Sequence, residues 1–449
     1  MTTEPRPDET RHTNEKNTRS RKHTRRAFLG GTSAAAVGVA GGAALTACAR
    51  ADSGSGAAAG AAEAKLSPTA VGEATIPFYG EHQAGIATPP QAHCVFRAFD
   101  LAGAPDNRRD YAAVPRLGGD DAKRFAAALK GVLRVWTDDG ARLVQGEAGL
   151  ADMDPELAEN PARLTLTVGF GPRLFDLIGR PELRPRWLRQ MPAFEIDDLD
   201  EGFNGGDLLL HIAADDPLTV ANASRLLSAG VRGLVVPRWS QQGFRKAAGA
   251  HPKNMTQRNL FGQLDGTVQP DTGGDLVFCG AGEEQEWMRG GAGLVLRRIV
   301  MNMETWEEVD PPQRDLSLGR SQSTGAPLNG EHEFDPVDLE AKDKAGLEVI
   351  PPQSHVARAH ARTPEEQFLR RPYNFTSDAG GGDPESGLLF AAYCANIDRQ
   401  FLPVQERLAE ADLLNTWTTP TGSAVFALPP GLGESRAEGG GFLGDGLFA

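Results

Sequence analysis

The segment DLLLHIAADDPLTVANASRLLSAGVRGLVVPRW, residues 207–239, contains the succession of elements from which the fold can be predicted. Its first nine residues are mostly apolar, which is typical of a buried strand. Asp215 and Asp216 follow, and Asp is a favourable N-cap residue, so residues 217–230 are predicted to form a helix. The apolar run at 232–239 then predicts a second strand. The segment therefore predicts a strand, a helix and a strand in sequence.

A similar pattern lies upstream of this segment. HCVFRAFDL (93–101) and RLTLTVGF (163–170) are predicted strands, and KRFAAALKGVLRVW (123–136) between them is a predicted helix. The apolar residues of this helix that share one face are Phe125, Leu129, Val132, Leu133 and Trp136. Together with the first segment, the order is β-α-β-β-α-β, which is the ferredoxin-like arrangement.

The second half repeats the pattern less regularly. GLVLRRIVMN (293–302), GLLFAAYCANI (387–397) and SAVFALP (423–429) are predicted strands, and RQFLPVQERLAEA (399–411) is a predicted helix. About 85 residues rich in Gly, Pro and charge separate the first two strands, and an insertion of this length in a compact domain is usually functional.

These patterns predict an α+β protein built from two ferredoxin-like halves, with the chemistry in the loops of the second. We expect the N-terminal ferredoxin-like domain to span residues 76–248 and the C-terminal one to span residues 249–449.

The first 75 residues are not expected to belong to the folded body. Residues 1–26 carry a net charge of +4, and residues 27–47 carry no charge, as in a secretory signal. Arg25 and Arg26 at the junction are a twin-arginine pattern, which predicts export of the folded protein to the cell exterior or the outer face of the membrane. Residues 48–75 are predicted to be a flexible linker.

The cysteines define two further expectations. LTAC (45–48) resembles a lipobox and predicts a lipid anchor on Cys48; the alternative is ordinary cleavage nearby. Cys94, Cys279 and Cys394 are an odd number in mostly apolar surroundings, so buried thiols are favoured over a disulfide framework. The sequence contains no CxxC, which argues against a zinc ribbon or an iron–sulfur cluster. The net charge of −14 argues against a nucleic-acid partner.

Candidate catalytic residues gather in three segments of the second half. Asp265 lies in RNLFGQLDGTVQP (258–270), where Asp-Gly alone indicates only a turn. His355 and His360 lie in PPQSHVARAHAR, and Arg370 lies in FLRRPYNF. No GxSxG, GxxxxGK[ST], HExxH or protein-kinase set of motifs occurs, which excludes several hydrolase and phosphotransferase classes.

Five segments in order resemble the dye-decolorising peroxidase family, and within it the exported subgroup that includes deferrochelatase/peroxidases. The segments are FYGEHQAGIATPPQAH (78–93), NLFGQLDGT (259–267), RRIVMNMETW (297–306), SHVARAHAR (354–362) and FLRRPYNF (368–375). The resemblance extends from about residue 78 to residue 430. It implies two ferredoxin-like halves of the dimeric α+β barrel type, with one haem b per chain in the C-terminal half. It also implies hydrogen peroxide and a small-molecule or protein reductant as partners.

The resemblance also implies roles for individual residues. His355 corresponds to the iron ligand, Asp265 to the acid on the opposite side of the haem, and Arg370 to the arginine beside that acid. Further haem-binding positions are Gly266, Thr267, Val268, His360, Ala361 and Arg362, with Arg362 suited to a propionate. The chain departs from the family at Val268-Gln269, where Ala-Asn is frequent, and at Ala361, where Pro is usual.

Three functions remain open. A peroxidase needs a base that moves a proton between the two oxygens of peroxide and a cation that stabilises the developing charge, and Asp265 and Arg370 suit these roles. The alternatives are a deferrochelatase, which releases iron from haem with the porphyrin intact, and a non-catalytic haem-binding protein. If bulky dyes cannot reach the haem, surface aromatics would relay electrons; the candidates are Tyr373, Tyr393 and Trp417, each of which could instead be a core residue.

Overall fold

The N-terminal half has the predicted order of elements. A computed structural model describes residues 71–107, 117–247, 249–250, 255–283, 285–377 and 384–448. The predicted signal, the linker up to residue 70 and Cys48 lie outside the described residues. The elements are β1 (His93–Leu101), α1 (Gly119–Leu143), β2 (Thr165–Phe170), β3 (Leu208–Ala214), α3 (Pro217–Gly230) and β4 (Val235–Phe244). Their sheet is antiparallel in the order β2-β3-β1-β4.

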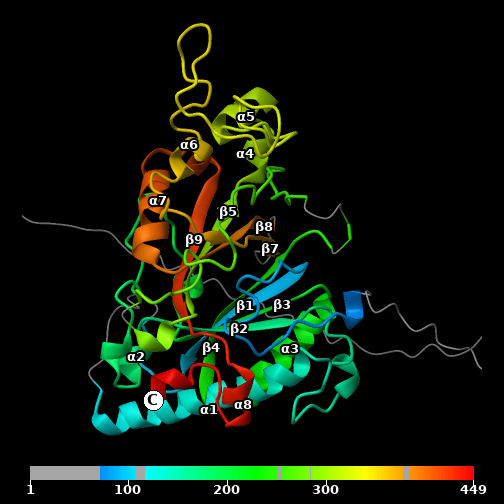
Figure 1. The fold of residues 1–449 in the computed structure, drawn as a ribbon, viewed down its shortest axis with the longest axis vertical. Helices are drawn as coiled ribbons and strands as arrows, with labels where there is room; N and C mark the ends of the chain where they lie inside the picture. The colour runs from blue at the N-terminus through cyan, green and yellow to red at the C-terminus, as the bar shows by residue number, and fades with distance from the viewer. Residues whose placement is uncertain are drawn as a thin grey trace, which may run out of the picture. The chain divides into compact units, whose positions relative to one another are not determined.

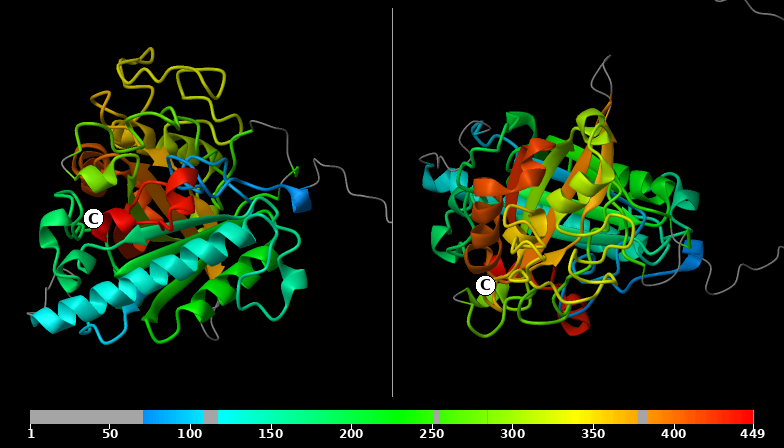
Figure 2. Two further views of the ribbon diagram at one scale, coloured as in Figure 1. Left: turned by 60° about the horizontal axis from the view of Figure 1, so that its bottom comes forward. Right: turned by 90° about the horizontal axis from the view of Figure 1, so that it is seen from above.

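Local signals explain the two helices of this half. The Asp216 side chain accepts a hydrogen bond from the Thr219 amide at 2.8 Å, so the predicted N-cap of α3 is confirmed. In α1 the predicted apolar face is buried, and the Trp136 indole donates to the Leu227 carbonyl of α3 at 3.0 Å. Figure 2 shows the two helices side by side against one face of the sheet.

The C-terminal half repeats this topology. Its elements are β5 (Ala292–Met301), α4 (Met303–Glu307), α5 (Pro311–Leu318), α6 (His355–Ala359), β6 (Leu369–Arg370), β7 (Tyr373–Ser377), β8 (Glu385–Cys394), α7 (Ile397–Ala411) and β9 (Thr418–Leu428). The strand order is β9-β5-β8-β7. The segment between β5 and β8 is more structured than we expected from its composition, because it contains α4, α5, α6 and the short strands β6 and β7.

The two half-sheets form one closed ring of strands (Figure 1). β2 pairs with β9 through Phe170 and Ala427, and β4 pairs with β7 through Phe244 and Asn374. Because β5 pairs with both β9 and β8, the sheet closes on itself. The expected barrel of two ferredoxin-like halves is therefore confirmed. The boundary between residues 248 and 249 stays a prediction, since strands of both halves belong to one sheet.

The barrel separates two layers of apolar packing. Its interior is filled by a cluster that includes Phe96, Leu209, Phe375, Tyr393 and Phe426. A second cluster lies outside, between the strands and the helices α1, α3 and α7. Cys94 belongs to the inner cluster, and Cys279 and Cys394 to the outer one; all three are buried free thiols, as predicted.

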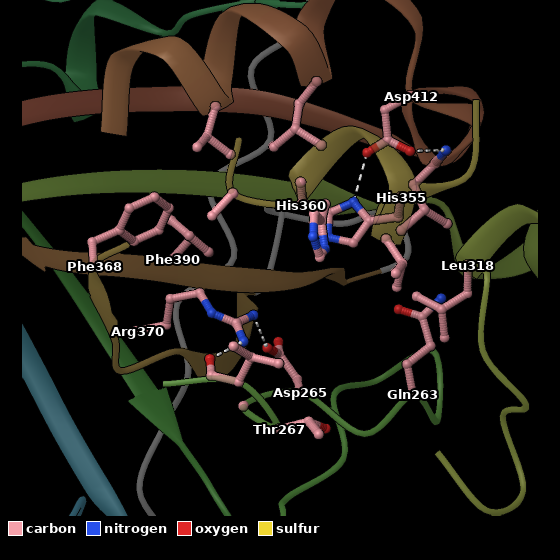
Figure 3. Close-up of a pocket in the computed structure, with 18 of the residues that line it drawn as sticks. Gln263, Asp265, Thr267, Leu318, His355, His360, Phe368, Arg370, Phe390 and Asp412 are labelled. Atoms are coloured by element: carbon pink, nitrogen blue, oxygen red, sulfur yellow. Dashed lines mark hydrogen bonds and ion pairs between the residues drawn. The ribbon is translucent and has the colours of Figure 1, made fainter. Parts of the chain in front are cut away.

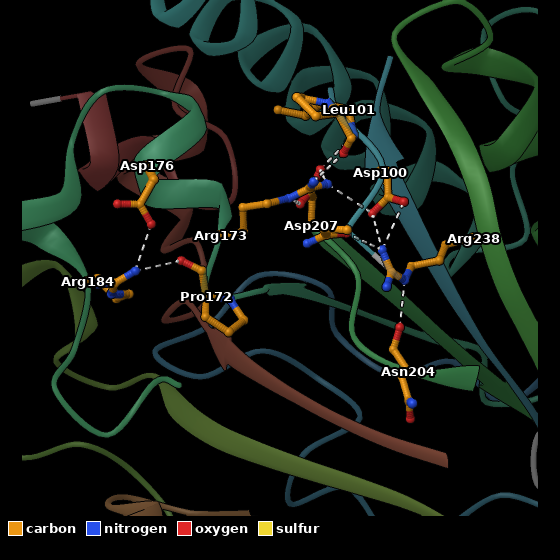
Figure 4. Close-up of polar contacts among 11 residues, drawn as sticks. Asp100, Leu101, Pro172, Arg173, Asp176, Arg184, Asn204, Asp207 and Arg238 are labelled. Carbon is orange, nitrogen blue, oxygen red and sulfur yellow. Dashed lines mark hydrogen bonds and ion pairs between the residues drawn. The ribbon is translucent and has the colours of Figure 1, made fainter. Parts of the chain in front are cut away.

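A buried network of charges joins the loops at one end of β1, β3 and β4 (Figure 4). Arg173 donates to both carboxylate oxygens of Asp207 at 2.8 and 2.9 Å, and Arg238 contacts Asp100 at 3.1 Å. Asp207 also accepts the Leu101 amide at 3.0 Å. Two arginines and two aspartates compensate each other there, which is the arrangement that buried charges require. We assign this network a structural role.

His211 on β3 is a core residue of the barrel. It is buried in the barrel and stacked on Phe96, with ring centroids 4.1 Å apart. Its Nδ1 lies 3.5 Å from the Tyr393 hydroxyl, but its Nε2 has no partner within the described chain. The ring therefore contributes packing to the barrel interior, with one of its two nitrogens left without a partner in the described chain. Burial, and secondarily Arg371, lower the pKa of His211, which keeps the ring neutral.

Among the described residues, no helix combines the length and apolar character that crossing a membrane requires.

Candidate active site

A cavity of about 810 Å³ lies in the C-terminal half, between the outer face of β5 and β8, the helices α6 and α7, and the loop 259–270. This volume is within the range typical of cofactor sites. All nine site residues predicted from the sequence line the cavity: Asp265, Gly266, Thr267, Val268, His355, His360, Ala361, Arg362 and Arg370.

His355 is held by a carboxylate that the sequence did not identify. It is the first residue of α6, and the Ser354 side chain caps that helix by accepting the Ala357 amide. Nδ1 of His355 lies 2.6 Å from Oδ2 of Asp412. Since a carboxylate accepts hydrogen bonds, Nδ1 carries the proton, and Nε2 is the nitrogen left for the cavity (Figure 3).

Asp412 is itself fixed in place. It follows α7 and is the N-cap of the 3₁₀ turn Leu413–Thr416, where Oδ1 accepts the Leu414 amide at 3.0 Å. Its side chain is only 4% exposed, so water does not compete for the contact with His355. Burial opposes a charged His355, but the Asp412 carboxylate outweighs this effect and raises the pKa of His355 above its ordinary value.

Asp265 lies across the cavity from His355, together with Arg370 (Figure 3). Nη1 of Arg370 lies 3.3 Å from Oδ1 of Asp265, and Nη2 donates to the Val268 carbonyl at 3.0 Å. The Asp265 amide donates to the Gln257 carbonyl at 2.8 Å, and Gly266 follows with φ +127°, a value that favours glycine. The loop therefore aims a carboxylate at the cavity and places a guanidinium beside it.

Gln269 positions the arginine. Its side-chain amide donates to the Arg370 carbonyl at 2.9 Å, and its Oε1 accepts the Arg370 amide at 2.9 Å. These two bonds fix the backbone of Arg370 in β6, which pairs with β8 at Ala392. The Gln269 side chain thus has a local function, because both of its polar atoms reach the backbone of the adjacent strand.

Arg362 is suited to bind an anion at the cavity rim. Its backbone amide donates to Glu366 at 3.0 Å, but its exposed side chain makes no hydrogen bond within the described chain. Glu366 is engaged by Arg407 at 2.8 Å, and Arg407 also donates to the His360 carbonyl at 3.1 Å. Arg407 of α7 therefore holds the backbone of the segment 360–362, and the Arg362 guanidinium remains available to bind a ligand.

These residues fit a haem. One histidine nitrogen faces a cavity whose walls include the apolar side chains of Ile299, Leu388 and Phe390, and a free guanidinium lies at the rim. The described chain contains no group of three or more His, Cys, Asp or Glu side chains that could hold a bare metal ion. A single histidine ligand suits an iron whose other protein-independent ligands would come from a porphyrin.

Two of the three candidate relay residues are not at the surface. Tyr373 and Tyr393 have 0% exposure and fill the barrel interior, because β7 and β8 direct these side chains away from solvent. Of the two alternatives left open for these tyrosines, both take the core position. Trp417 is half-buried and packs edge-on against Trp306, with ring centroids 5.1 Å apart.

Comparison with known proteins identifies the class. The description "Dyp-type peroxidase, N-terminal" matches residues 120–245, and "Dyp-type peroxidase, C-terminal" matches residues 256–433. These matches cover more than half of the chain. The chain therefore belongs to the Dyp-type, or dye-decolorising, peroxidase family, and it is a haem-dependent peroxidase.

Individual relatives agree with this assignment. The chain is 36% identical to a dye-decolorizing peroxidase of Thermobifida fusca, over 80% of this chain and 84% of that protein. It is 34% identical to a deferrochelatase of Escherichia coli, over 83% and 87% of the two chains. The crystal structure of a DyP-type peroxidase from Cellulomonas bogoriensis has a TM-score of 0.76 and 43% identity, over 84% of this chain and 99% of that one.

The contact between His355 and Asp412 generates a prediction. Asp412→Asn keeps an oxygen for the Leu414 amide but loses the carboxylate that accepts the His355 proton. Because such partners orient the ligand and raise its basicity, haem affinity should fall by about 10–100-fold. The measurement is a titration of haem-free protein with haem, followed by absorption.

Glu410→Gln is the matched control. Glu410 is a neighbouring acid that contacts α6 through Arg358 rather than through His355, and its side chain is 74% exposed. This variant should bind haem as the parent does. Equal haem affinity in Asp412→Asn and Glu410→Gln would contradict the role given to Asp412.

Proposed function

We propose that this chain is a haem b peroxidase that uses hydrogen peroxide to oxidise dyes, phenols and related donors. In this proposal His355 is the iron ligand, Asp265 moves the proton, and Arg370 stabilises charge. The observation that carries the proposal is the arrangement of the cavity: a histidine oriented by Asp412 lies on one side, and a carboxylate paired with a guanidinium lies on the other.

The ligand side of the site is the first part of the proposal. When bound, haem supplies the iron centre that exchanges electrons with peroxide and with the donor. His355 would hold it through Nε2, and Arg362 would bind a propionate at the rim. The loop at Gly266, Thr267 and Val268 and the segment from His360 to Arg362 would line the haem.

Proton transfer is the second part. Reduction of hydrogen peroxide to water requires that one oxygen loses a proton while the leaving oxygen gains one. The Asp265 carboxylate can accept the first proton and return it to the leaving oxygen. Arg370, 3.3 Å away, stabilises the negative charge that develops as the O–O bond breaks, and its position is fixed by Gln269.

The roles of the three residues should separate by mutation. Asp265→Asn retains the size of the side chain but removes the base, so haem content should be normal while the reaction with peroxide slows by about 10²–10⁴-fold. Arg370→Leu should slow the same step by about 10²–10³-fold. His355→Ala should lose haem or change its absorption spectrum, because the defect is in ligation. Stopped-flow absorption after mixing with peroxide measures the step.

Asp271→Asn is the control, since Asp271 is an exposed acid directly after the loop 259–270 and its carboxylate accepts the Gly273 amide of its own turn. It should react at the parental rate. An Asp265→Asn enzyme as fast as this control would show that Asp265 only shapes the turn. A haem-replete, fully active His355→Ala protein would contradict the ligand assignment.

Release of iron from haem is the second candidate function, because the chain is 34% identical to a protein named deferrochelatase. We expect peroxidase activity without metal-free porphyrin, since the Asp265–Arg370 pair suits peroxide chemistry and iron release requires no such pair. Incubation of the protein with haem, followed by protoporphyrin fluorescence, tests this. Accumulation of metal-free porphyrin would favour the deferrochelatase function.

We also propose export by the twin-arginine route, on the pattern at Arg25 and Arg26, with either a lipid on Cys48 or ordinary cleavage nearby. Replacing both arginines with lysine should retain haem-loaded protein inside the cell, as measured by cell fractionation. Normal export of the double variant would contradict this proposal. Membrane association that Cys48→Ala leaves unchanged would argue against the lipid.

A further inference from the structure

A second pocket lies in the N-terminal half, far along the chain from the residues discussed above. Its volume is about 660 Å³, and it lies between α3 and the faces of β1 and β4 that α3 covers. The polar side chains that line it are Arg97, Arg225, Arg232, Ser224, Ser228, Ser240 and Gln242. None of its lining residues is Asp or Glu, although the whole chain has a net charge of −14.

This pocket is the topological counterpart of the haem cavity. Both β1 and β5 contain a register shift, between Ala98 and Phe99 in β1 and between Arg298 and Ile299 in β5. When β1 and β5 are aligned at their register shifts, Arg97 corresponds to Arg297. The residues paired opposite correspond as well, since Arg97 pairs with Ser240 and Arg297 pairs with Ser423.

The correspondence extends beyond the arginines. Two residues further along each strand, Phe99 pairs with Pro237 and Ile299 pairs with Pro420. These four residues line their respective cavities. Each cavity is also covered by the helix that precedes the last strand of its half, α3 or α7.

The two arginines differ in how their charge is compensated. Arg297 forms a buried ion pair with Asp197, whose Oδ2 lies 3.3 Å from Nη1 of Arg297. Arg97 has no carboxylate partner within the described chain. Its Nη1 donates to the hydroxyl of Ser224 at 3.1 Å, and its Nε is buried without a hydrogen-bond partner. Burial lowers the pKa of Arg97, as expected for a guanidinium withdrawn from water.

Other polar groups converge on the same space. Arg232 is exposed immediately beyond α3, and its side chain makes no ion pair within the described residues. Ser240 lies opposite Arg97 on β4, and its hydroxyl forms no hydrogen bond within the described chain. Arg225 lies 3.5 Å from Asp154, and this long contact joins two side chains that are both more than half exposed. Guanidinium and hydroxyl donors of this kind recognise oxyanions.

The size and walls of the pocket define the rest of the ligand. The volume greatly exceeds the roughly 30 Å³ that one water molecule takes in the liquid, so a bare oxyanion would leave most of it to solvent. The apolar lining residues that remain accessible are Ala221, Ala229 and Pro237. We propose that this pocket binds an organic anion, with its carboxylate, phosphate or sulfonate group at Arg97 and its apolar body against these residues.

Isothermal titration of the haem-loaded protein with phenyl phosphate tests the proposal, because the haem then occupies the other cavity. We expect one phenyl phosphate per chain, with weaker binding of inorganic phosphate at the same pH and ionic strength. Arg97→Gln should weaken phenyl phosphate binding about tenfold or more, since it removes charge-assisted hydrogen bonds. Arg97→Lys, which retains the charge but loses the planar fork, should have a smaller effect.

Two further variants distinguish loss of the binding site from misfolding caused by the substitutions at Arg97. Ala221→Phe, on the exposed side of α3 where it lines the pocket, should block binding without a change of charge. Arg180→Gln is the control, since Arg180 forms a surface pair with Glu182 outside the pocket and should bind as the parent does. The haem absorption spectrum of each variant reports folding.

Three results would overturn the proposal. The first is absence of phenyl phosphate binding to the parent protein. The second is binding that neither Arg97→Gln nor Ala221→Phe weakens, which would place the ligand elsewhere. The third is inorganic phosphate binding as tightly as phenyl phosphate, which would remove the organic part of the assignment.

Discussion

Closure of the sheet is the constraint on which the rest of the structure depends. Each ferredoxin-like half would leave two open edges. In the described part of the chain these edges meet through the backbone pairs Phe170 with Ala427 and Phe244 with Asn374. Because the barrel is closed, the helices pack on its outer face. In each half a cavity lies between the sheet and the helix that precedes the last strand. Within the C-terminal half, the pairing of β6 with β8 places Arg370. The contact with Asp412, directly after α7, places His355.

The two cavities show how one scaffold can serve different ligands through the compensation of a single charge. At equivalent positions on the first strand of each half, Arg297 is neutralised by Asp197, while the hydrogen bonds of Arg97 within the described chain go to a hydroxyl and a carbonyl. In the first arrangement, the arginine is paired within the protein, beside the cavity of the C-terminal half. The second leaves a cation facing its pocket. The backbone is similar in both halves, and the difference lies in whether a loop supplies a carboxylate.

Sequence patterns predicted those parts of the fold that local physics determines. The apolar runs of β1 and β3, the apolar face of α1 and the Asp216 cap of α3 act within a few residues of their cause, and each was found. β7 was missed because it is a short strand that begins directly after Pro372 and gains its stability from pairing with β8.

Within the site, the resemblance to a family located the residues that line the cavity, but not their supports. Asp412 follows a helix like many capping residues, and nothing local indicates that it contacts a histidine 57 positions earlier in the chain. Gln269 likewise acts on a strand 101 residues away. Such contacts are tertiary. The sequence also could not predict which face of the sheet Tyr393 occupies, since an aromatic residue in an apolar strand can face either side until the barrel is closed.

The three buried cysteines have a consequence for a protein that handles an oxidant. Peroxide attacks the thiolate rather than the thiol, and susceptibility follows both thiolate content and exposure. Burial raises the pKa of Cys94, Cys279 and Cys394, so these sulfurs stay protonated as well as shielded. The same packing that builds the core therefore limits the oxidation of these three thiols by peroxide.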